Sequence, residues 1–479
     1  MVLNKKNNEL IIFLFVINLI FFIRYNIDYT LFFLQFNLCC ILLLNLIYKS
    51  VRLGSNLFYP LPITCIILLI SCVIAPIISF GEKHYMFLPS RDIDWEKYLF
   101  LISLLYSIGI VFFYIVTKAL LVEKKIYIFD DATINKTHLI IISMIFLIFS
   151  LVTQILIFLK FGGIVGYLTQ WTEDRDALDG FGIWYMFAEP FPIILLVFLI
   201  LLIGRKKILN NKYKWIILLF IIFFISKLLF GGFRGSRSNT IWGLFLFAGI
   251  VHIYLFKLKK IHYILGILFL SGFMSIYAVY KTYGVEAFSG DYTIEDTNRY
   301  EGNPLLSIYL GDFSRATVNA FQLAQLNDLG NYNYKWGQTY LYTSTMILPP
   351  IKNIYTGYGK NSAGYEIINN QNINPEKDFF HNSRVFGLYG EGILNFGPVF
   401  ALFLFLFMAI FVVFLDNFCR GFLVSKVYIF LIPFLANLSF LFVVSDSDNI
   451  VFFLLKDGFL FIVYLVLIQN FSRKGISNV

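Results

Sequence analysis

The chain has 479 residues, of which 59% are hydrophobic and only 14% are charged. Ordinary soluble domains carry about 25% charged residues because their surface must face water, so this composition excludes a soluble protein and predicts a membrane protein. The formal net charge of +9 would suggest a nucleic-acid partner for a soluble chain, but in a membrane protein such an excess of Lys and Arg is typical of cytoplasmic loops, and we expect no nucleic acid.

Long apolar segments recur along the chain and predict an all-α polytopic membrane protein with about 12 transmembrane helices. A segment of about 20 residues spans a hydrocarbon layer of about 30 Å, because a helix rises about 1.5 Å per residue. The predicted spans are centred near Phe15, Cys39, Leu68, Ile108, Phe146, Val197, Phe220, Leu246, Leu268, Leu404, Leu435 and Phe461.

Clusters of Lys and Arg between these segments predict the orientation. If successive spans alternate in direction, the clusters all fall on one side, and cytoplasmic loops are the ones enriched in Lys and Arg. We therefore expect both termini in the cytoplasm. We expect no cleavable signal peptide, because the first apolar segment lacks a small-residue cleavage site. The clusters are Lys5 with Lys6, Lys49 with Arg52, Lys124 with Lys125, Arg205 to Lys207, Lys257 to Lys260, and Arg473 with Lys474.

The opposite, outer side is expected to carry the long connections. Residues 161–184 and 231–239 form two of them, and residues 281–391 form a large loop between the ninth and tenth spans. That loop far exceeds ordinary connections of about 4–6 residues, and loops of such length are usually functional. Residues 1–479 are therefore interpreted as one transmembrane domain with an outer lid. The many Tyr and Trp of the lid would suit a carbohydrate, although packing against lipid headgroups would use the same residues.

Two outer loops hold candidate arginines. Arg175 lies in an acidic stretch, where a solvated and internally paired loop is the alternative interpretation. Arg234 and Arg237 lie beside several glycines at the expected start of a span. Guanidinium groups bind phosphate bidentately and a helix N-terminus adds partial positive charge, so a diphosphate site is one interpretation. Anchoring to lipid phosphates is the other.

Several ionisable residues fall within or near apolar segments. Glu189 stands near the start of a span, where a carboxylate is costly unless it is paired or faces a cavity, so it is a secondary candidate. Lys227, Lys456 and Asp457 lie inside spans. A lysine that reaches toward the headgroups, or charges that neutralise different neighbours, explain these three without a catalytic role.

A third outer group comprises His381, Arg384 and Glu391. On one helix Arg384 and Glu391 would share a face, which permits an ion pair or joint contact with one ligand. A carboxylate tuned by a neighbouring arginine can accept a proton from a sugar hydroxyl. A purely structural salt bridge is the alternative. The sequence has no GKS or GKT loop, no HExxH and no GxSxG, so we expect neither a metal nor a cofactor.

From about Leu159 onward, the chain resembles the Wzy-type polymerases, which join oligosaccharide repeat units in the assembly of bacterial O-antigen and capsule. Four stretches carry the resemblance: KFGGIVGYL (160–168), followed by Arg175 and GFG (180–182); RGSRSNTIWGL (234–244); GQTYLYTSTMILPP (337–350); and SRVFGLYGEGILNFGPVF (383–400). The last is the most specific, because it places Gly-Glu before Asn-Phe-Gly at the start of a late span.

The resemblance implies a multi-pass glycosyltransferase of the bacterial inner membrane, with a fold like that of the lipid-linked-sugar (GT-C-like) glycosyltransferases. It would polymerise undecaprenyl-diphosphate-linked repeat units at the periplasmic face, for lipopolysaccharide or capsule. Its partners would be those lipid-linked oligosaccharides, membrane lipids and a chain-length regulator protein, with no cofactor. An O-antigen ligase and a lipid-linked oligosaccharide flippase remain alternatives.

The expected site follows from the resemblance together with the residues already described. Arg234, Arg237 and Arg175 are expected to bind the diphosphate, because positive charge stabilises the leaving group. Glu391 is the first candidate to activate the acceptor or hold Arg384, and His381 is the second.

Overall fold

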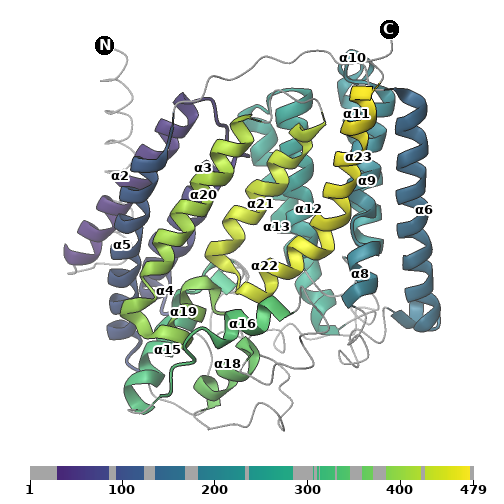
Figure 1. Ribbon diagram of the computed structural model, residues 1–479. Coiled ribbons are helices and arrows are strands. Elements are labelled where there is room, and N and C mark those ends of the chain that lie inside the picture. Colours follow the sequence, from purple (N-terminus) through teal and green to yellow (C-terminus); the bar gives the residue numbers. More distant parts are fainter. Residues whose placement is uncertain are drawn as a thin grey trace, which may run out of the picture.

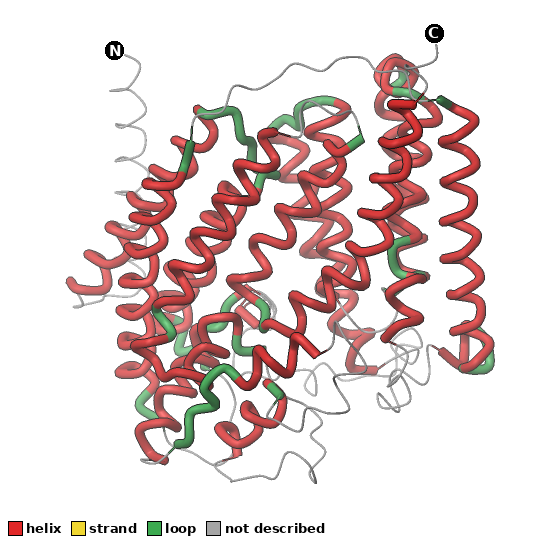
Figure 2. Tube along the Cα trace, in the orientation of Figure 1, coloured by secondary structure: helices red, strands yellow, loops and turns green. Residues whose placement is uncertain are grey.

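The computed structural model describes residues 30–85, 93–122, 135–167, 182–231, 237–283, 306, 310–311, 313–329, 332–345, 359–369, 385–421 and 427–474. Every regular element in these ranges is helical (Figure 2). Within these ranges, eight helices are long and apolar enough to cross a membrane. These findings confirm the predicted class of an all-helical, multi-pass membrane protein.

Eight of the predicted span centres fall in these eight helices: Cys39, Leu68, Ile108, Phe146, Val197, Leu268, Leu404 and Phe461. Leu246 and Leu435 fall instead in shorter apolar helices. Phe220 lies in a helix of 18 residues that carries three charged side chains, Lys212, Lys214 and Lys227. Phe15 lies outside the described residues. The structure thus supports eight of the predicted spans by length and composition.

The described helices form two groups around two large apolar cores, and a small third core consists of Ile157, Phe161, Tyr167, Tyr185 and Ala188. The first group includes α2 (Thr30–Arg52), α3 (Pro60–Leu68), η1 (Leu69–Ile74), α4 (Ala75–Gly81), α5 (Trp95–Leu120) and α20 (Phe403–Gly421). The second includes α6 (Lys136–Lys160), α8 (Gly182–Ala188), α9 (Phe191–Ile203), α10 (Arg205–Asn210), α11 (Lys212–Leu229), α12 (Arg237–Ile250), η4 (Val251–Leu255), η8 (Tyr428–Phe430), α21 (Leu431–Val444), α22 (Ser447–Phe453), η9 (Leu454–Phe459) and α23 (Leu460–Lys474). α13 (Lys260–Tyr283) packs lightly beside α12.

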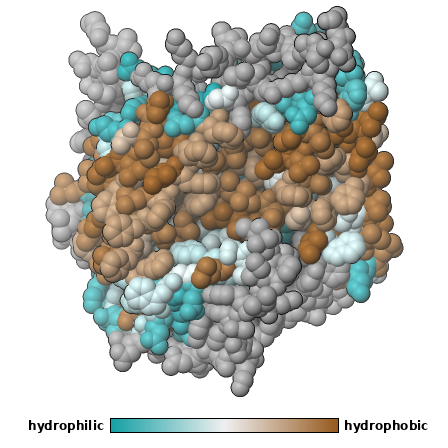
Figure 3. Space-filling view, viewed as in Figure 1, coloured by the Kyte–Doolittle hydropathy of each residue, from teal (hydrophilic) through white to brown (hydrophobic). Residues whose placement is uncertain are grey.

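Helices from the predicted outer loop gather at one end of the bundle, opposite α10 and the end of α23 (Figure 1). We call α15 (Ala316–Leu329), α16 (Gln338–Thr345) and α18 (Lys360–Asn369) the cap helices. Figure 3 shows an apolar band across the middle of the face in view, with hydrophilic residues toward both ends. This distribution is the one expected when side chains face hydrocarbon in the middle and water at the ends.

Cationic helix ends meet at the end of the bundle opposite the cap. Lys49 Nζ donates to the carbonyl of Lys118 at 3.4 Å, and Arg205 donates to the carbonyl of Leu255 at 3.5 Å. Arg420 is fully buried and pairs with Asp416 at 3.0 Å. The cations therefore satisfy the last carbonyls of neighbouring helices, which lack partners within their own helix.

The helix α19 (Gly387–Phe400) lies between the cap helices and the bundle (Figure 1). It begins at Gly387, whose φ of +74° favours glycine, and it breaks at Gly397, with a φ of +81°, just before Pro398. The chain then enters the span α20. Because of this break, α19 is separate from that span and holds its polar residues beneath the cap.

Candidate functional site

Glu391 of α19 is fully buried, and both of its carboxylate oxygens accept hydrogen bonds. Thr339 Oγ1, from the cap helix α16, donates to Oε1 at 2.6 Å. Ser447, the first residue of α22, donates from its hydroxyl to Oε1 and from its backbone N–H to Oε2, each at 2.7 Å. One carboxylate therefore joins the cap, α19 and the start of the candidate span Ser447–Phe471.

Asn395 fixes α16 against α19. Its Nδ2 donates to the carbonyl of Glu391 at 2.9 Å and to Thr339 Oγ1 at 2.7 Å. Its Oδ1 accepts from the N–H of Gly337 at 3.0 Å. Gly337 has a φ of +87°, which favours glycine, so the sequence Trp-Gly forms the tight turn that starts α16 at this point. The Thr339 hydroxyl is thereby aimed at Glu391.

A second buried carboxylate, Asp446, connects the cap helix α18 to the start of α19. Lys360 Nζ lies 2.9 Å from Asp446 Oδ2 and 3.7 Å from Asp448 Oδ2. The N–H of Phe386, just before α19, donates to Asp446 Oδ1 at 2.9 Å. Glu391, Asp446, Ser447, Thr339 and Lys360 form what we call the polar layer, a set of groups beneath the cap contributed by α16, α18, α19 and the start of α22.

Burial and charge shift the acidity of this layer. Burial, together with the charge of nearby Asp446, raises the pKa of Glu391 to about 7, against the opposing effect of hydrogen bonds from Thr339 and Ser447. Burial also raises the pKa of Asp446, against the opposing charge of Lys360. The ordinary pKa of a glutamate side chain is 4.5. Glu391 can therefore take up and release a proton near neutral pH, as a general base must.

Glu391 is the predicted catalytic residue that the structure describes in full. His381 and Arg384 lie outside the described residues, as do Arg175 and Arg234. Arg237 begins α12, but its side chain is not among those described. Because α19 begins only at Gly387, helical spacing does not place Arg384 on the same face as Glu391.

The secondary candidate Glu189 is buried and accepts a hydrogen bond from Asn239 Nδ2 at 3.1 Å. Nearby, Lys227 of α11 and Asp457 of η9 form a buried ion pair at 2.8 Å. Lys227 therefore does not reach toward the headgroups but neutralises Asp457 from another helix. The pairing follows the rule that intramembrane charges are costly unless paired. Lys456 Nζ lies 5.4 Å from the centroid of the Tyr185 ring.

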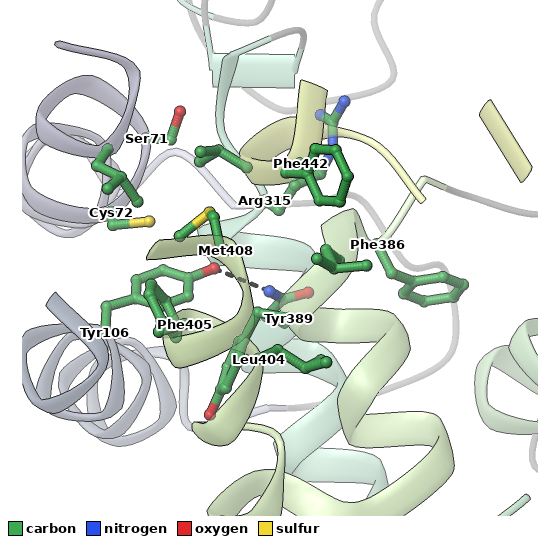
Figure 4. Close-up of a pocket in the computed structure, with 14 residues that line it drawn as sticks. Ser71, Cys72, Tyr106, Arg315, Phe386, Tyr389, Leu404, Phe405, Met408 and Phe442 are labelled. Atoms are coloured by element: carbon green, nitrogen blue, oxygen red, sulfur yellow. Dashed lines mark hydrogen bonds between the residues drawn. The ribbon is translucent and has the colours of Figure 1, made fainter. Parts of the chain in front are cut away.

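A small cavity is lined in part by Phe386, whose N–H bonds to Asp446 of the polar layer (Figure 4). Its walls are mostly apolar, and its polar lining includes Ser71, Tyr106, Arg315 and Asn319. Asn319 donates to the hydroxyl of Tyr106 at 2.8 Å, and Arg315 Nε donates to the carbonyl of Val444 at 2.9 Å. The volume of about 20 Å³ suffices for about one water molecule. In this conformation, the cavity therefore does not accommodate a sugar.

Sequence reasoning missed Asp446, Ser447 and Lys360. A signal for the first two exists in the stretch Ser-Asp-Ser-Asp-Asn (445–449), which interrupts apolar residues on both sides. Lys360 offered no comparable signal, because one lysine in a polar loop is unremarkable.

Comparisons with known proteins found no match. No protein-family model, no curated protein and no solved structure matches this chain.

Proposed function

We propose that the protein polymerises undecaprenyl-diphosphate-linked oligosaccharide repeat units into O-antigen or capsular polysaccharide at the periplasmic face of a bacterial inner membrane. A hydroxyl of one lipid-linked unit attacks the anomeric carbon of the glycan carried by another. The bond from that carbon to the diphosphate breaks, and undecaprenyl diphosphate leaves. The proposal uses about 12 spans, with the polar layer at the outer end.

The observation that carries the proposal is the state of Glu391. The acceptor hydroxyl must lose a proton as it attacks, and a carboxylate with a pKa near the working pH is well suited to receive it. Glu391 has a pKa of about 7 and lies beneath a polar cap, at the end of the bundle where a lipid-linked glycan would sit. Its position on α19 agrees with the Gly-Glu motif on which the family resemblance rests.

The other parts of the reaction are assigned from the resemblance. Arg175, Arg234 and Arg237 bind the diphosphate, and preorganised positive charge there lowers the barrier to its departure. Arg384 and His381 assist Glu391. A chain-length regulator protein and the surrounding lipids complete the set of partners.

The test is complementation of a strain that lacks the gene. Wild-type protein restores a polysaccharide ladder on a gel, whereas Glu391→Gln, which keeps the size of the side chain but cannot accept the proton as a carboxylate does, leaves single repeat units. Glu96→Gln is the matched control, because Glu96 is an exposed carboxylate on α5 outside the polar layer. Membrane levels of each variant are measured by immunoblot.

Three results would contradict the proposal. A full ladder from Glu391→Gln at normal protein levels removes Glu391 from catalysis. In the deletion strain, full-length polymer stranded on the carrier lipid indicates an O-antigen ligase, and repeat units held at the cytoplasmic face indicate a flippase.

A further inference from the structure

Glu391 is shielded from solvent by its own hydrogen-bond partners. Its side chain is fully buried, and both oxygens are occupied by donors from Thr339 and Ser447. An acceptor sugar therefore does not touch this carboxylate directly in the arrangement observed. A proton from outside has to reach it through one of the groups that already bond to it.

Of the two hydroxyls that bond to Glu391, only that of Ser447 belongs to a residue with appreciable exposure. Thr339 is fully buried, and its Oγ1 already accepts from Asn395. Ser447 is half-buried at the start of α22. Its hydroxyl lies 2.7 Å from Glu391 Oε1 and 2.9 Å from Thr343 Oγ1. Ser447 thus stands between the buried carboxylate and the accessible side of the polar layer.

The hydrogen-bond capacity of Ser447 leaves room for one more partner. A serine hydroxyl has one proton to donate and two lone pairs that accept. In Ser447 the proton points to Glu391, so the hydroxyl of Thr343 must be the donor in the contact between the two. One lone pair of Ser447 Oγ remains, and it can accept a hydrogen bond from the hydroxyl of an incoming sugar.

We propose that Ser447 is a catalytic proton relay between the acceptor sugar and Glu391. The inference rests on the proposed polymerase function. As the acceptor oxygen bonds to the anomeric carbon, the acceptor's proton moves to Ser447 Oγ and the original proton of Ser447 moves to Glu391 Oε1. The bond between the anomeric carbon and the diphosphate oxygen breaks, and its electron pair leaves with undecaprenyl diphosphate.

Charged and titratable groups around the relay set its pH dependence. Those that face Glu391 and Ser447 are Asp446 and Asp448 beside the relay, Lys360 from α18, Tyr340 from α16, and Arg315, which acts on Asp446. Glu391 receives a proton only when it is ionised. The wild-type rate is therefore expected to rise as the pH increases through about 7.

The experiment compares Ser447→Thr with Ser447→Val in membranes that receive the purified undecaprenyl-diphosphate-linked repeat unit. The two replacements have nearly the same shape, but only threonine keeps the hydroxyl. We expect Ser447→Thr to retain kcat within about threefold and Ser447→Val to lose about 10²- to 10⁴-fold, the range of general acid–base catalysis, with little change in KM. The remaining rate of Ser447→Val is expected to be flat across pH 7.

Controls separate the relay from a loss of folding. Ser344→Ala on α16 removes an exposed hydroxyl that donates only to the carbonyl of Leu341, and it should leave kcat unchanged. If Ser447→Val does not accumulate in the membrane, Ser447→Ala takes its place, and the solvent deuterium isotope effect on kcat is measured. A relay gives the wild type a larger isotope effect than the variant.

The outcomes distinguish failure of the relay from failure of the proposed function. A Ser447→Val or Ser447→Ala variant with wild-type kcat and pH profile, alongside an inactive Glu391→Gln variant, overturns the relay and leaves the polymerase standing. Equal isotope effects in the wild type and Ser447→Ala also overturn it. A wild-type protein that forms no polymer overturns the proposed function itself.

Discussion

Replacing Lys360 by Met is expected to loosen the cap at one place. Lys360 Nζ lies 2.9 Å from Asp446 Oδ2, and both side chains are buried. At an effective dielectric constant of about 20, two unit charges at this distance attract by about 6 kcal/mol, before the cost of desolvating them. Removing one partner of such a pair costs about 3–5 kcal/mol, because the other charge stays buried without compensation.

Hydrogen exchange measured by mass spectrometry in lipid nanodiscs reports this change locally. The N–H of Phe386 bonds to Asp446, and the N–H of Ser447 bonds to Glu391, so both amides exchange only when the polar layer opens. A loss of about 3 kcal/mol corresponds to about 100-fold faster exchange, since 1.4 kcal/mol is tenfold. Peptides from the middle of α20 should keep the wild-type rate.

A double variant tests whether the uncompensated charge is the cause. Asn at position 446 still accepts from the N–H of Phe386 but carries no charge, so Lys360→Met with Asp446→Asn should restore exchange to within about tenfold of wild type. Lys97→Met, on an exposed turn of α5, is the surface control. Wild-type exchange in Lys360→Met, or faster exchange in the double variant than in the single one, would refute the reasoning.

Two further predictions concern α19. A methyl group at Gly390 would lie 2.4 Å from Asn319 Oδ1, so Gly390→Ala should push α19 away from α15. We expect this variant to have a lower midpoint of thermal unfolding and to form no polysaccharide ladder. An unchanged midpoint would contradict the close packing of α19 on α15. The pKa of Glu391 is about 7 in the folded protein and 4.5 ordinarily, so the folded state binds the proton more tightly than the unfolded state does. The free energy of unfolding therefore falls as the pH rises from about 4.5 to about 7. Midpoints from a pH series should show this decline, and Glu391→Gln should remove that part of it.

Hydropathy predicted the eight spans that the structure supports, because hydropathy depends on single helices. A helix in hydrocarbon satisfies its own backbone and needs only apolar side chains over sufficient length, so the sequence of each segment is enough. The count was less certain where segments were short or carried lysines, as in α11 and α21. For such helices, neighbours rather than composition decide the depth at which they lie.

Pairings between distant residues were harder to predict. Glu391 could be singled out because a lone carboxylate among glycines at the mouth of an apolar segment is unusual in itself. Its partner Thr339 has no such local mark, and the polar stretch 445–449 marks Ser447 without indicating that it faces Glu391. Nothing local indicates that Lys227 pairs with Asp457 either. Which helices face each other decides these contacts, and hydrophobic patterns of single segments do not encode that choice.

The anchoring of the cap to α22 has a consequence for biosynthesis. Glu391 and the cap helices leave the ribosome before Asp446 and Ser447, which stand at the head of the candidate span Ser447–Phe471. The polar layer therefore stays incomplete until that segment has inserted. A nascent chain that stops before this segment contains Glu391 and the cap helices but lacks Asp446 and Ser447, so the polar layer can form only after translation has passed Ser447.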